Sequence, residues 1–292
     1  MSDKLLFFKY LTPSVDDINW GLTINVVGFA HIAPNDIYPP KGHPTGYSFN
    51  WANGRILQEF QLLYFTDGSG VFETRDNKFQ IQSGTVLFIF PGTWHRYRPN
   101  KGTGWKEHYL GFSGLFTQNI FQEKFIVKEK PILYIGFQDK IIKQFHEIIE
   151  EVQEEKPGYQ QVVAGIAMHL FGNILSIHKN RDFSGKEIER KIRQSCITIR
   201  ENLNQQLNIE HLADDLHLGY SHYRRVFKKY TGLSPAQYHL NLRLQKAREL
   251  LLNTEMSVKQ IAFEMGFQSN HYFTRIFTRK IGVTPSEIRK IV

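Results

Sequence analysis

The alternation of apolar runs and turn residues predicts a β-rich first part of the chain. Between residues 58 and 112, short apolar segments are separated by Gly, Pro, Asp and Asn, as in strands joined by tight turns. The sequence Asp67-Gly68-Ser69-Gly70 predicts a hairpin turn between two strands. Residues 86–90 are apolar on both faces and predict a central strand, and residues 105–112 predict another. Strands at this spacing favour a barrel or a double-sheet jelly roll.

Helical periodicity replaces the strand pattern after this region. Over residues 139–155 apolar positions recur every three or four residues, which predicts an amphipathic helix. Its apolar stripe consists of Ile141, Ile142, Phe145, Ile148, Ile149 and Val152. The stripe is compatible with a dimer seam and equally with packing on the β-rich domain. A second helix is predicted over residues 159–178, with Val162 on its apolar face, and the polar residues 179–186 predict an interdomain linker.

The last part of the chain contains a repeat of about 50 residues. The first copy carries Leu218, Ser221, Arg225, Phe227, Lys229, Gly232 and Pro235, and the second carries Phe267, Asn270, Arg275, Phe277, Arg279, Gly282 and Pro285. The offset is 49 between Ala213 and Ala262 and 50 from Tyr223 and Phe273 onward, so the second copy has one extra residue in its turn. Each copy predicts a helix-turn-helix unit, and residues 235–252 predict a long helix that joins the two.

The second helix of each unit has an apolar side and a polar, basic side. Ser221 is the expected N-cap of the first such helix. The candidates for DNA contact are Ser221, His222, Arg224, Arg225, Lys228 and Lys229 in the first unit, and Asn270, His271, Tyr272, Thr274, Arg275 and Arg279 in the second. Asn can bind adenine and Arg can bind guanine through two hydrogen bonds, each worth about 1–3 kcal/mol of discrimination. Because the N-terminal half of such a helix enters the major groove, the repeat indicates double-stranded DNA as a partner.

The distribution of charge agrees with this prediction. Residues 1–180 hold 17 Lys and Arg against 17 Asp and Glu, and residues 181–292 hold 19 against 11. The whole net charge of +8 therefore lies on the segment that carries the repeat. A basic domain attached to a neutral one is the electrostatic signature of a nucleic-acid binder.

The single cysteine and the chain's hydropathy predict a cytoplasmic location. Cys196 cannot form an internal disulfide, which fits a reducing compartment, and its place in a predicted helix indicates a small buried hydrophobe. Asp3 and Lys4 precede only a short apolar run, so no signal peptide is predicted. No run of 18 uncharged apolar residues occurs, and no membrane span is predicted.

The segment Gly84, Pro91, Gly92, His95 and Asn100 resembles the second conserved motif of the cupin superfamily. Metal-dependent cupins also need a His-x-His motif, because a metal ion requires three or four converging ligands. Residues 55–70, where that motif should lie, contain no histidine. We therefore expect a cupin-like barrel that binds its ligand without a metal or another cofactor.

Aromatic residues with polar tips gather on the strands that follow the Pro-Gly turn. Alternate residues of a strand share a face, so Trp105, Glu107 and Tyr109 should point one way and Lys106 and His108 the other. Rings that cover C–H faces and a carboxylate that accepts from hydroxyls suit a sugar. The alternative is that the rings form core and Glu107 lies at a rim. The effector-binding candidates are Arg55, Trp94, His95, Tyr97, Trp105, Glu107 and Tyr109, of which Arg55 is the weaker because such a charge is more often solvated.

The second copy of the repeat resembles the signature of the AraC/XylS family of bacterial transcription regulators. The resemblance holds at Ile261, Ala262, Gly266, Phe267, Ser269, Phe273, Arg275, Phe277, Lys280, Gly282, Thr284, Pro285 and Arg289, and in the runs Arg243-Leu244, Ala247-Arg248 and Leu250-Leu251. Ile288 stands where an aromatic is usual but can still pack. Thr278 stands where a basic residue is common, which would remove one phosphate contact.

The resemblance implies a cupin-like effector domain, which the β-rich half indicates independently, and dimerisation through that domain. In sugar-responsive members the pocket is lined by residues after the Pro-Gly turn and on the next strand. The matching positions here are Tyr97, Glu107 and Tyr109, together with Arg55.

The sequence thus predicts an α+β chain of two domains. Residues 1–178 form a cupin-like β-barrel or jelly roll with a helical dimerisation segment, and residues 187–292 form an all-α double helix-turn-helix domain. The predicted function is a ligand-responsive transcription factor without enzymatic activity. Its expected partners are promoter DNA, a sugar or similar small polar effector, a second copy and RNA polymerase. One alternative is a constitutive DNA binder whose barrel only dimerises. The other is a cupin enzyme tethered to DNA, which the missing His-x-His motif argues against.

Overall fold

The computed structural model describes residues 6–40, 50–122, 126–181, 183, 187–205 and 207–290. The chain divides into two compact units, Met1–Asp182 and Phe183–Val292. The division falls inside the predicted linker 179–186. The helix before it continues to Asn180, and Phe183 is buried against Tyr230 within the second unit. Asn180 and Phe183 of that segment therefore belong to folded units, while residues 182 and 184–186 lie outside the described part.

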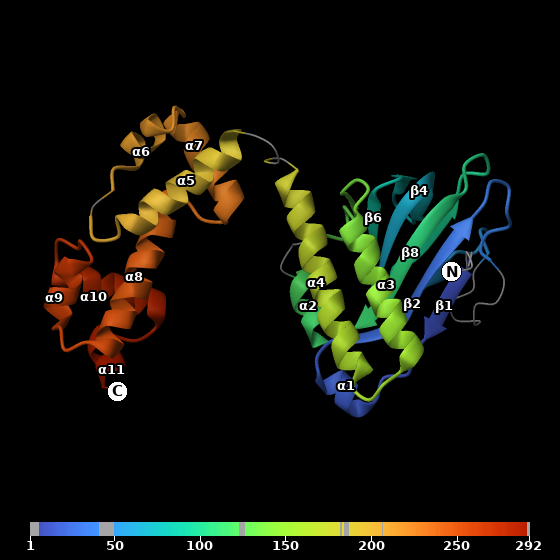
Figure 1. Cartoon of the computed structure of the whole chain (residues 1–292), viewed down its shortest axis with the longest axis horizontal. Helices are drawn as coiled ribbons and strands as arrows, with labels where there is room; N and C mark the ends of the chain where they lie inside the picture. Colours follow the sequence, from blue (N-terminus) through green and yellow to red (C-terminus); the bar gives the residue numbers. More distant parts are fainter. Residues whose placement is uncertain are drawn as a thin grey trace. The chain divides into compact units, whose positions relative to one another are not determined.

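The first unit is built on an antiparallel sheet (Figure 1). Its strands are β1 (Leu6–Tyr10), β2 (Thr23–Ile32), β3 (Arg55–Ile56), β4 (Phe60–Thr74), β5 (Lys78–Gln82), β6 (Thr85–Ile89), β7 (Trp94–Pro99), β8 (Trp105–Ser113) and β9 (Ile132–Tyr134). The main path runs β1-β2-β8-β4-β6-β9, while β5 and β7 pair with β4, and β3 pairs with β7. Among the described strands, β1 and β9 end this path unpaired on one side. The closed barrel of the prediction is therefore corrected to an open arrangement in which β4 serves two sets of partners.

Strand β4 is continuous where the sequence predicted a hairpin. Its first part pairs with β6 and β8, and its second part pairs with β5 and β7. The register shifts between Phe65 and Asp67, and such a bulge bends a strand. Gly68 has a φ of +75°, and a Cβ on it would lie 2.1 Å from the carbonyl oxygen of Gly104. The hairpin prediction was wrong because glycines that permit close backbone approach at a bulge have the composition of a turn.

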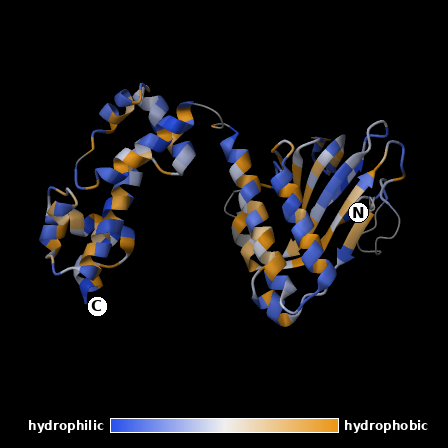
Figure 2. Cartoon of the chain, in the orientation of Figure 1, coloured by the Kyte–Doolittle hydropathy of each residue, from blue (hydrophilic) through white to orange (hydrophobic). Residues whose placement is uncertain are grey.

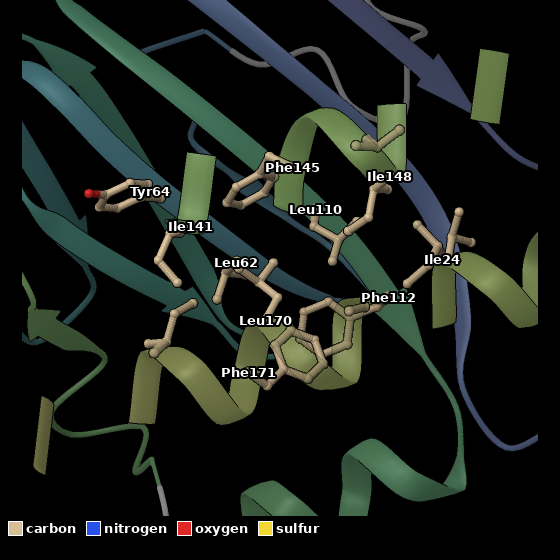
Figure 3. Packing of buried hydrophobic residues seen from close by; sticks show 14 of the residues in the cluster. Ile24, Leu62, Tyr64, Leu110, Phe112, Ile141, Phe145, Ile148, Leu170 and Phe171 are labelled. Atoms are coloured by element: carbon tan, nitrogen blue, oxygen red, sulfur yellow. The ribbon is translucent and has the colours of Figure 1, made fainter. Parts of the chain in front are cut away.

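Helices α3 (Asp139–Glu154) and α4 (Tyr159–Asn180) cover one face of the sheet (Figure 1), and α1 (Val15–Asn19) and α2 (Leu115–Gln122) are shorter. Figure 3 shows side chains of α3 and α4 that point toward Leu62, Leu110 and Phe112 of the strands. The α3 residues Ile141, Phe145, Ile148 and Val152 have no exposed surface. The predicted stripe packs on its own domain, so the hypothesis that it forms a dimer seam is wrong.

Helices α3 and α4 differ in hydropathy. Helix α3 alternates hydrophilic and hydrophobic positions along its length (Figure 2). Among the described residues, α4 is the one helix that is long and apolar enough to cross a membrane by length and composition alone. This is weak evidence, because Ala164, Ala167, Leu170 and Ile174 of α4 are buried in the core against α3 and the sheet. Val162, which was predicted on the apolar face, is 47% exposed.

The second unit is helical and contains the repeat (Figure 1). Its helices are α5 (Glu187–Glu201), α6 (Ile209–Asp215), α7 (Tyr220–Thr231), α8 (Pro235–Asn253), α9 (Val258–Glu264), α10 (Asn270–Ile281) and α11 (Pro285–Arg289). Residues 216–219 join α6 to α7, and residues 265–269 join α9 to α10. The extra residue of the second copy therefore lies in its turn, as the sequence predicts.

The two copies also end alike. Gly232 and Gly282 stop α7 and α10 in the left-handed region, with φ of +83° and +91°, which glycine adopts without steric cost. Ser234 and Thr284 then form capping boxes at the next helices, each followed by a proline in the first turn. The sequence repeat therefore includes the residues that end one helix and cap the next.

The start of α7 differs from the prediction. Helix α7 begins at Tyr220 with Gly219 as its N-cap, and no side chain caps it. Ser221 therefore lies inside the first turn and is exposed rather than capping. At α10, Ser269 is the N-cap and its Oγ accepts from the Tyr272 amide at 3.3 Å. The error arose because the polar residue nearest the helix start is not at the position where the backbone leaves the helical region.

Each helix-turn-helix unit has its own small core. Tyr223 and Phe227 pack with Cys196 in the first, and the Tyr223 hydroxyl lies 2.6 Å from the Ser195 Oγ of α5. Cys196 is 7% exposed, which confirms it as a buried hydrophobe. In the second core, Ile288 is 4% exposed, so this aliphatic residue packs as expected from the sequence.

The close approach at the β4 bulge predicts a difference between two glycine variants. Gly68→Ala should lower the free energy of unfolding by about 1–3 kcal/mol more than Gly92→Ala. Both glycines have positive φ, but a Cβ on Gly92 would meet nothing within 4 Å. Denaturant unfolding followed by circular dichroism measures the two values. Equal losses would show that the backbone contact at Gly68 relaxes without cost.

Candidate effector pocket and nucleic-acid interface

A cavity opens in the first unit on the side of β8 that faces away from α3. Its interior offers about 30 Å³ to the centre of a water molecule, within a hollow of about 420 Å³ that includes open solvent. Its lining residues come from six strands and the segment after β2: Tyr10, Val26, Tyr38, Pro39, Pro40, Arg55, Gln61, Tyr97, Glu107 and Tyr109. The mixture of rings with a few polar groups is typical of a small-molecule site.

Strand β8 separates this cavity from the helix-covered core by simple alternation. Glu107 and Tyr109 line the cavity, and Trp105 is buried beside them, with its ring centroid 5.4 Å from that of Tyr38. His108 points the other way, to the ring of Phe145 on α3. The predicted division of β8 into two faces is confirmed. Gly28 on β2 makes room for Tyr109, because a Cβ there would lie 2.5 Å from the Tyr109 Cζ.

Arg55 is held at the cavity wall by two neighbours on β7. Its Nη2 donates to the Tyr97 hydroxyl at 2.6 Å, and its Nε donates to Nε2 of His95 at 3.2 Å. The other nitrogen of His95, Nδ1, lies 2.9 Å from the Thr93 carbonyl oxygen. Burial and then the charge of Arg55 lower the pKa of His95 to about 3. His95 is therefore a neutral, fully engaged support for Arg55.

Glu107 is a buried carboxyl with an incomplete set of partners. It is 4% exposed; its Oε1 accepts from the Tyr38 hydroxyl at 3.4 Å, and its Oε2 has no hydrogen-bond partner. Burial raises the pKa of Glu107 to about 8, although the nearby charge of Arg55 acts to lower it. The Tyr109 hydroxyl is likewise buried without a partner, and burial raises its pKa. Both groups can bond to an occupant of the cavity.

The structure brings together most of the predicted effector residues. Arg55, Tyr97, Glu107 and Tyr109 line one cavity, and His95 and Trp105 lie buried directly behind it. Trp94 does not join them. It alternates with His95 on β7, donates its Nε1 to the Asn53 carbonyl oxygen, and lies near the guanidinium groups of Arg75 and Arg96 on the opposite face. The grouping of Trp94 with the others was wrong because it ignored the two-residue period of the strand.

Sequence reasoning missed the cavity residues that lie before residue 55. Tyr38, Pro39 and Pro40 come from the segment after β2, and Tyr10 comes from the edge strand β1. Tyr10 and Gln61 lie on strands whose residues alternate between two faces, but no local sequence pattern predicts which of the two faces lines the cavity. The aromatic and proline content of residues 38–40 was the available signal. In the described part of the chain, no three His, Cys, Asp or Glu side chains converge in a way that could hold a metal ion.

The second helix of each helix-turn-helix unit presents the predicted contact residues to the surface. On α7, Ser221, His222, Arg224, Arg225, Lys228 and Lys229 are all exposed. His222 and Arg225 are joined by a hydrogen bond of 3.1 Å, and Arg224 lies 5.3 Å from the ring centre of Tyr220. Tyr223 and Phe227 occupy the opposite, buried side of the helix.

The contact residues of α10 are less uniformly exposed. His271, Tyr272, Arg275 and Arg279 are exposed, whereas Thr274 and Asn270 are half-buried. The Oδ1 of Asn270 is buried without a partner. A two-bond contact from Asn270 to adenine therefore requires its side chain to turn outward.

Arg243 of the long helix α8 holds the turn of the second unit. Its Nε donates to the Met265 carbonyl oxygen, and its guanidinium carbon lies 3.8 Å from the ring centre of Phe267. Gly266 has a φ of +68°, and a Cβ there would lie 2.6 Å from the Asn204 carbonyl oxygen. The joining helix thus positions α10 through this turn, a role for Arg243 that its place in a sequence motif did not reveal.

A ligand-type cavity in a sheet domain and two helix-turn-helix units in one chain define a transcription regulator with separate ligand-binding and DNA-binding domains. Residues 34–171 match the AraC-like ligand binding domain, and residues 212–291 match a helix-turn-helix domain of this kind. The chain belongs to the AraC family of transcriptional regulators.

Three known regulators are similar to this chain over most of its length. The HTH-type transcriptional regulator YfiF of Bacillus subtilis is 41% identical, over 80% of this chain and 77% of its own. The MmsAB operon regulatory protein of Pseudomonas aeruginosa is 24% identical, over 90% and 85%. The lactose operon transcription activator of Staphylococcus xylosus is 22% identical, over 81% and 86%. The solved C-terminal domain of AraT from Geobacillus stearothermophilus is 30% identical over 35% of this chain and 85% of its own, with a TM-score of 0.34.

The raised pKa of Glu107 predicts a pH dependence of stability. Between pH 4.5 and about 8 the folded chain keeps a proton on Glu107 that the unfolded chain has lost. Stability should therefore fall as pH rises through this window, by up to about 1.4 kcal/mol per pH unit. Glu107→Gln should remove this part of the fall and stabilise the chain most at pH 8. Urea unfolding at several pH values measures it, with Glu147→Gln on the exposed side of α3 as control. Parallel profiles for Glu107→Gln and the wild type would contradict the prediction.

Proposed function

We propose that this AraC-family regulator is ligand-responsive and that its effector is a sugar or similar small polar molecule that binds in the β8 cavity. The observation that carries the proposal is that Glu107 and Tyr109 line the cavity, while Glu107 Oε2 and the Tyr109 hydroxyl are buried without a hydrogen-bond partner among the described residues. A buried polar atom without a partner costs free energy, and a hydroxyl-bearing ligand would satisfy both. The name of the Staphylococcus xylosus relative, lactose operon transcription activator, supports the sugar class.

In this proposal the chain binds promoter DNA through both α7 and α10. Their exposed faces differ, with Arg224 and Arg225 near the start of α7 and His271 and Arg275 near the start of α10. Two recognition helices with one scaffold and unlike side chains would bind two unlike DNA segments. The half-site is therefore asymmetric.

The effector acts by favouring one arrangement of the protein over another. Such coupling requires tighter binding to one arrangement, which then changes promoter occupancy. We further propose that the chain works in the cytoplasm as a homodimer, contacts RNA polymerase, and needs neither a cofactor nor enzymatic activity. Since the α3 stripe is buried, the exposed side of α4, where Val162, Gly165 and Gly172 lie, is a better candidate for contact between subunits.

The effector proposal predicts a shift in thermal stability. A pentose, hexose or disaccharide at 100 times its Kd should stabilise the full-length chain by about 2.7 kcal/mol. Differential scanning fluorimetry with a sugar panel that includes lactose measures this, and Tyr109→Phe should reduce the shift because it removes a cavity hydroxyl. If another class of metabolite shifts the melting temperature and sugars do not, the sugar class is wrong. If no small molecule changes either stability or promoter affinity, the regulator is constitutive.

The DNA proposal predicts different effects for two basic residues. Arg275→Ala should relax base preference at one position and weaken specific binding by about 1–3 kcal/mol. Lys229→Ala should weaken binding to all sequences about equally and lower the salt dependence by about one unit of slope. Selection from a randomised DNA pool followed by salt titration measures both. An unchanged preference in Arg275→Ala would remove Arg275 from base recognition.

A further inference from the structure

Glu59 and Glu107 are two buried carboxyl groups among the described residues of the first unit, and they differ in their hydrogen-bond partners. Glu59 accepts from Gln61 Nε2 and from Asn25 Nδ2, both at 2.6 Å. Among the described residues, Glu107 has one bond, at 3.4 Å from Tyr38; it lines the cavity, and its Oε2 is buried without a partner. The fold thus satisfies one carboxylate from its own residues and leaves the other open toward the space where a ligand would lie. Burial of a carboxylate in this condition is costly unless an occupant supplies positive charge or donors.

The wall around Glu107 holds aromatic groups that attract a cation, beside the guanidinium of Arg55, whose charge already acts on Glu107. The aromatic residues Tyr10, Tyr38, Tyr97 and Tyr109 line the same cavity. Tyrosine ring faces attract a cation within about 6 Å, most strongly in a desolvated site. The cavity's own cation, Arg55, donates its Nε and Nη2 to His95 and Tyr97 on β7. A buried carboxylate with an unpartnered oxygen, in a cavity that four tyrosines line, has the chemistry that an ammonium group would require.

We propose that the effector is an amino sugar, a hydroxylated ring that carries an ammonium group, and that Glu107 binds this ammonium. The inference rests on the proposed sugar-class function of the cavity and narrows it to one chemical class. Gln61 and the Tyr109 hydroxyl then bond to the sugar hydroxyls. The positive charge of the ammonium stabilises the ionised form of the buried Glu107.

Binding of this kind has a proton balance. Burial raises the pKa of Glu107 to about 8, so the empty cavity holds a protonated carboxyl at pH 6.5. An ammonium ligand displaces that proton, whereas a neutral sugar does not. The titratable and charged groups that face Glu107 are Arg55 of β3, Tyr97 of β7, Tyr38 after β2, Tyr10 of β1 and Tyr109 of β8. Burial raises the pKa of each of these four tyrosines, so none of them releases a proton near pH 6.5.

The test compares sugars that differ only in the exchange of a hydroxyl for an ammonium. Isothermal titration of the full-length chain at pH 6.5 with glucosamine and glucose, galactosamine and galactose, and mannosamine and mannose should find one amino sugar that binds at least tenfold more tightly than its neutral partner. Repeating that titration in buffers of different ionisation enthalpy should show about one proton released per ligand bound.

Two variants assign the effect to Glu107. Glu107→Gln should lose at least tenfold in affinity for the amino sugar and release no proton, while Glu147→Gln, an exposed carboxylate on α3, should retain both. If a neutral sugar binds as tightly as its amino partner, the ammonium inference is overturned and the sugar proposal stands. The same holds if the amino sugar binds without releasing a proton. If none of the six sugars binds, the amino-sugar inference is overturned; the sugar class fails only if the pentoses and disaccharides of the wider panel also leave the melting temperature unchanged.

Discussion

The two faces of β8 divide the first unit into a polar cavity and an apolar core, and the rest of that unit depends on this division. Glu107 and Tyr109 point to the cavity, while His108 and Leu110 point to α3 and α4. The strand is paired on both sides, with β2 and β4. A slip of one residue would place a carboxyl in the apolar core and a leucine in the cavity. The free-energy cost of burying a carboxyl in the apolar core, or of exposing a leucine in the cavity, therefore fixes the register of β8.

The bend in β4 makes the cavity possible. Its first part lies beside β8 in the helix-covered sheet, and its second part carries β7, which delivers His95 and Tyr97 to the far wall. Close backbone approach at Gly68 and Gly70 permits this bend, since a Cβ at either position would meet a backbone carbonyl oxygen within 2.4 Å. The cavity thus takes its residues from strands far apart in sequence because one strand belongs to both sheets.

The second unit uses one scaffold twice with different surfaces. Glycine stops and capping boxes recur at matching places, and Tyr223 and Phe273 occupy matching core positions. The solvent side is free of this constraint. The exposed residues Arg224 and Arg225 on α7 and His271 and Arg275 on α10 can therefore differ without changing the fold.

The sequence by itself determined the two-domain plan, the double helix-turn-helix and the face of β8 that carries Glu107, because these follow from periods of two, 3.6 and 50 residues that local chemistry imposes. It could not separate a bulge from a hairpin at Gly68, or a core stripe from a dimer seam at Ile141, because each pair has the same local composition. Tertiary structure alone decided that Tyr10 and Tyr38 join the cavity, that Trp94 leaves it, and that Glu107 keeps an open oxygen. These outcomes depend on which distant strands meet, and no local period encodes that.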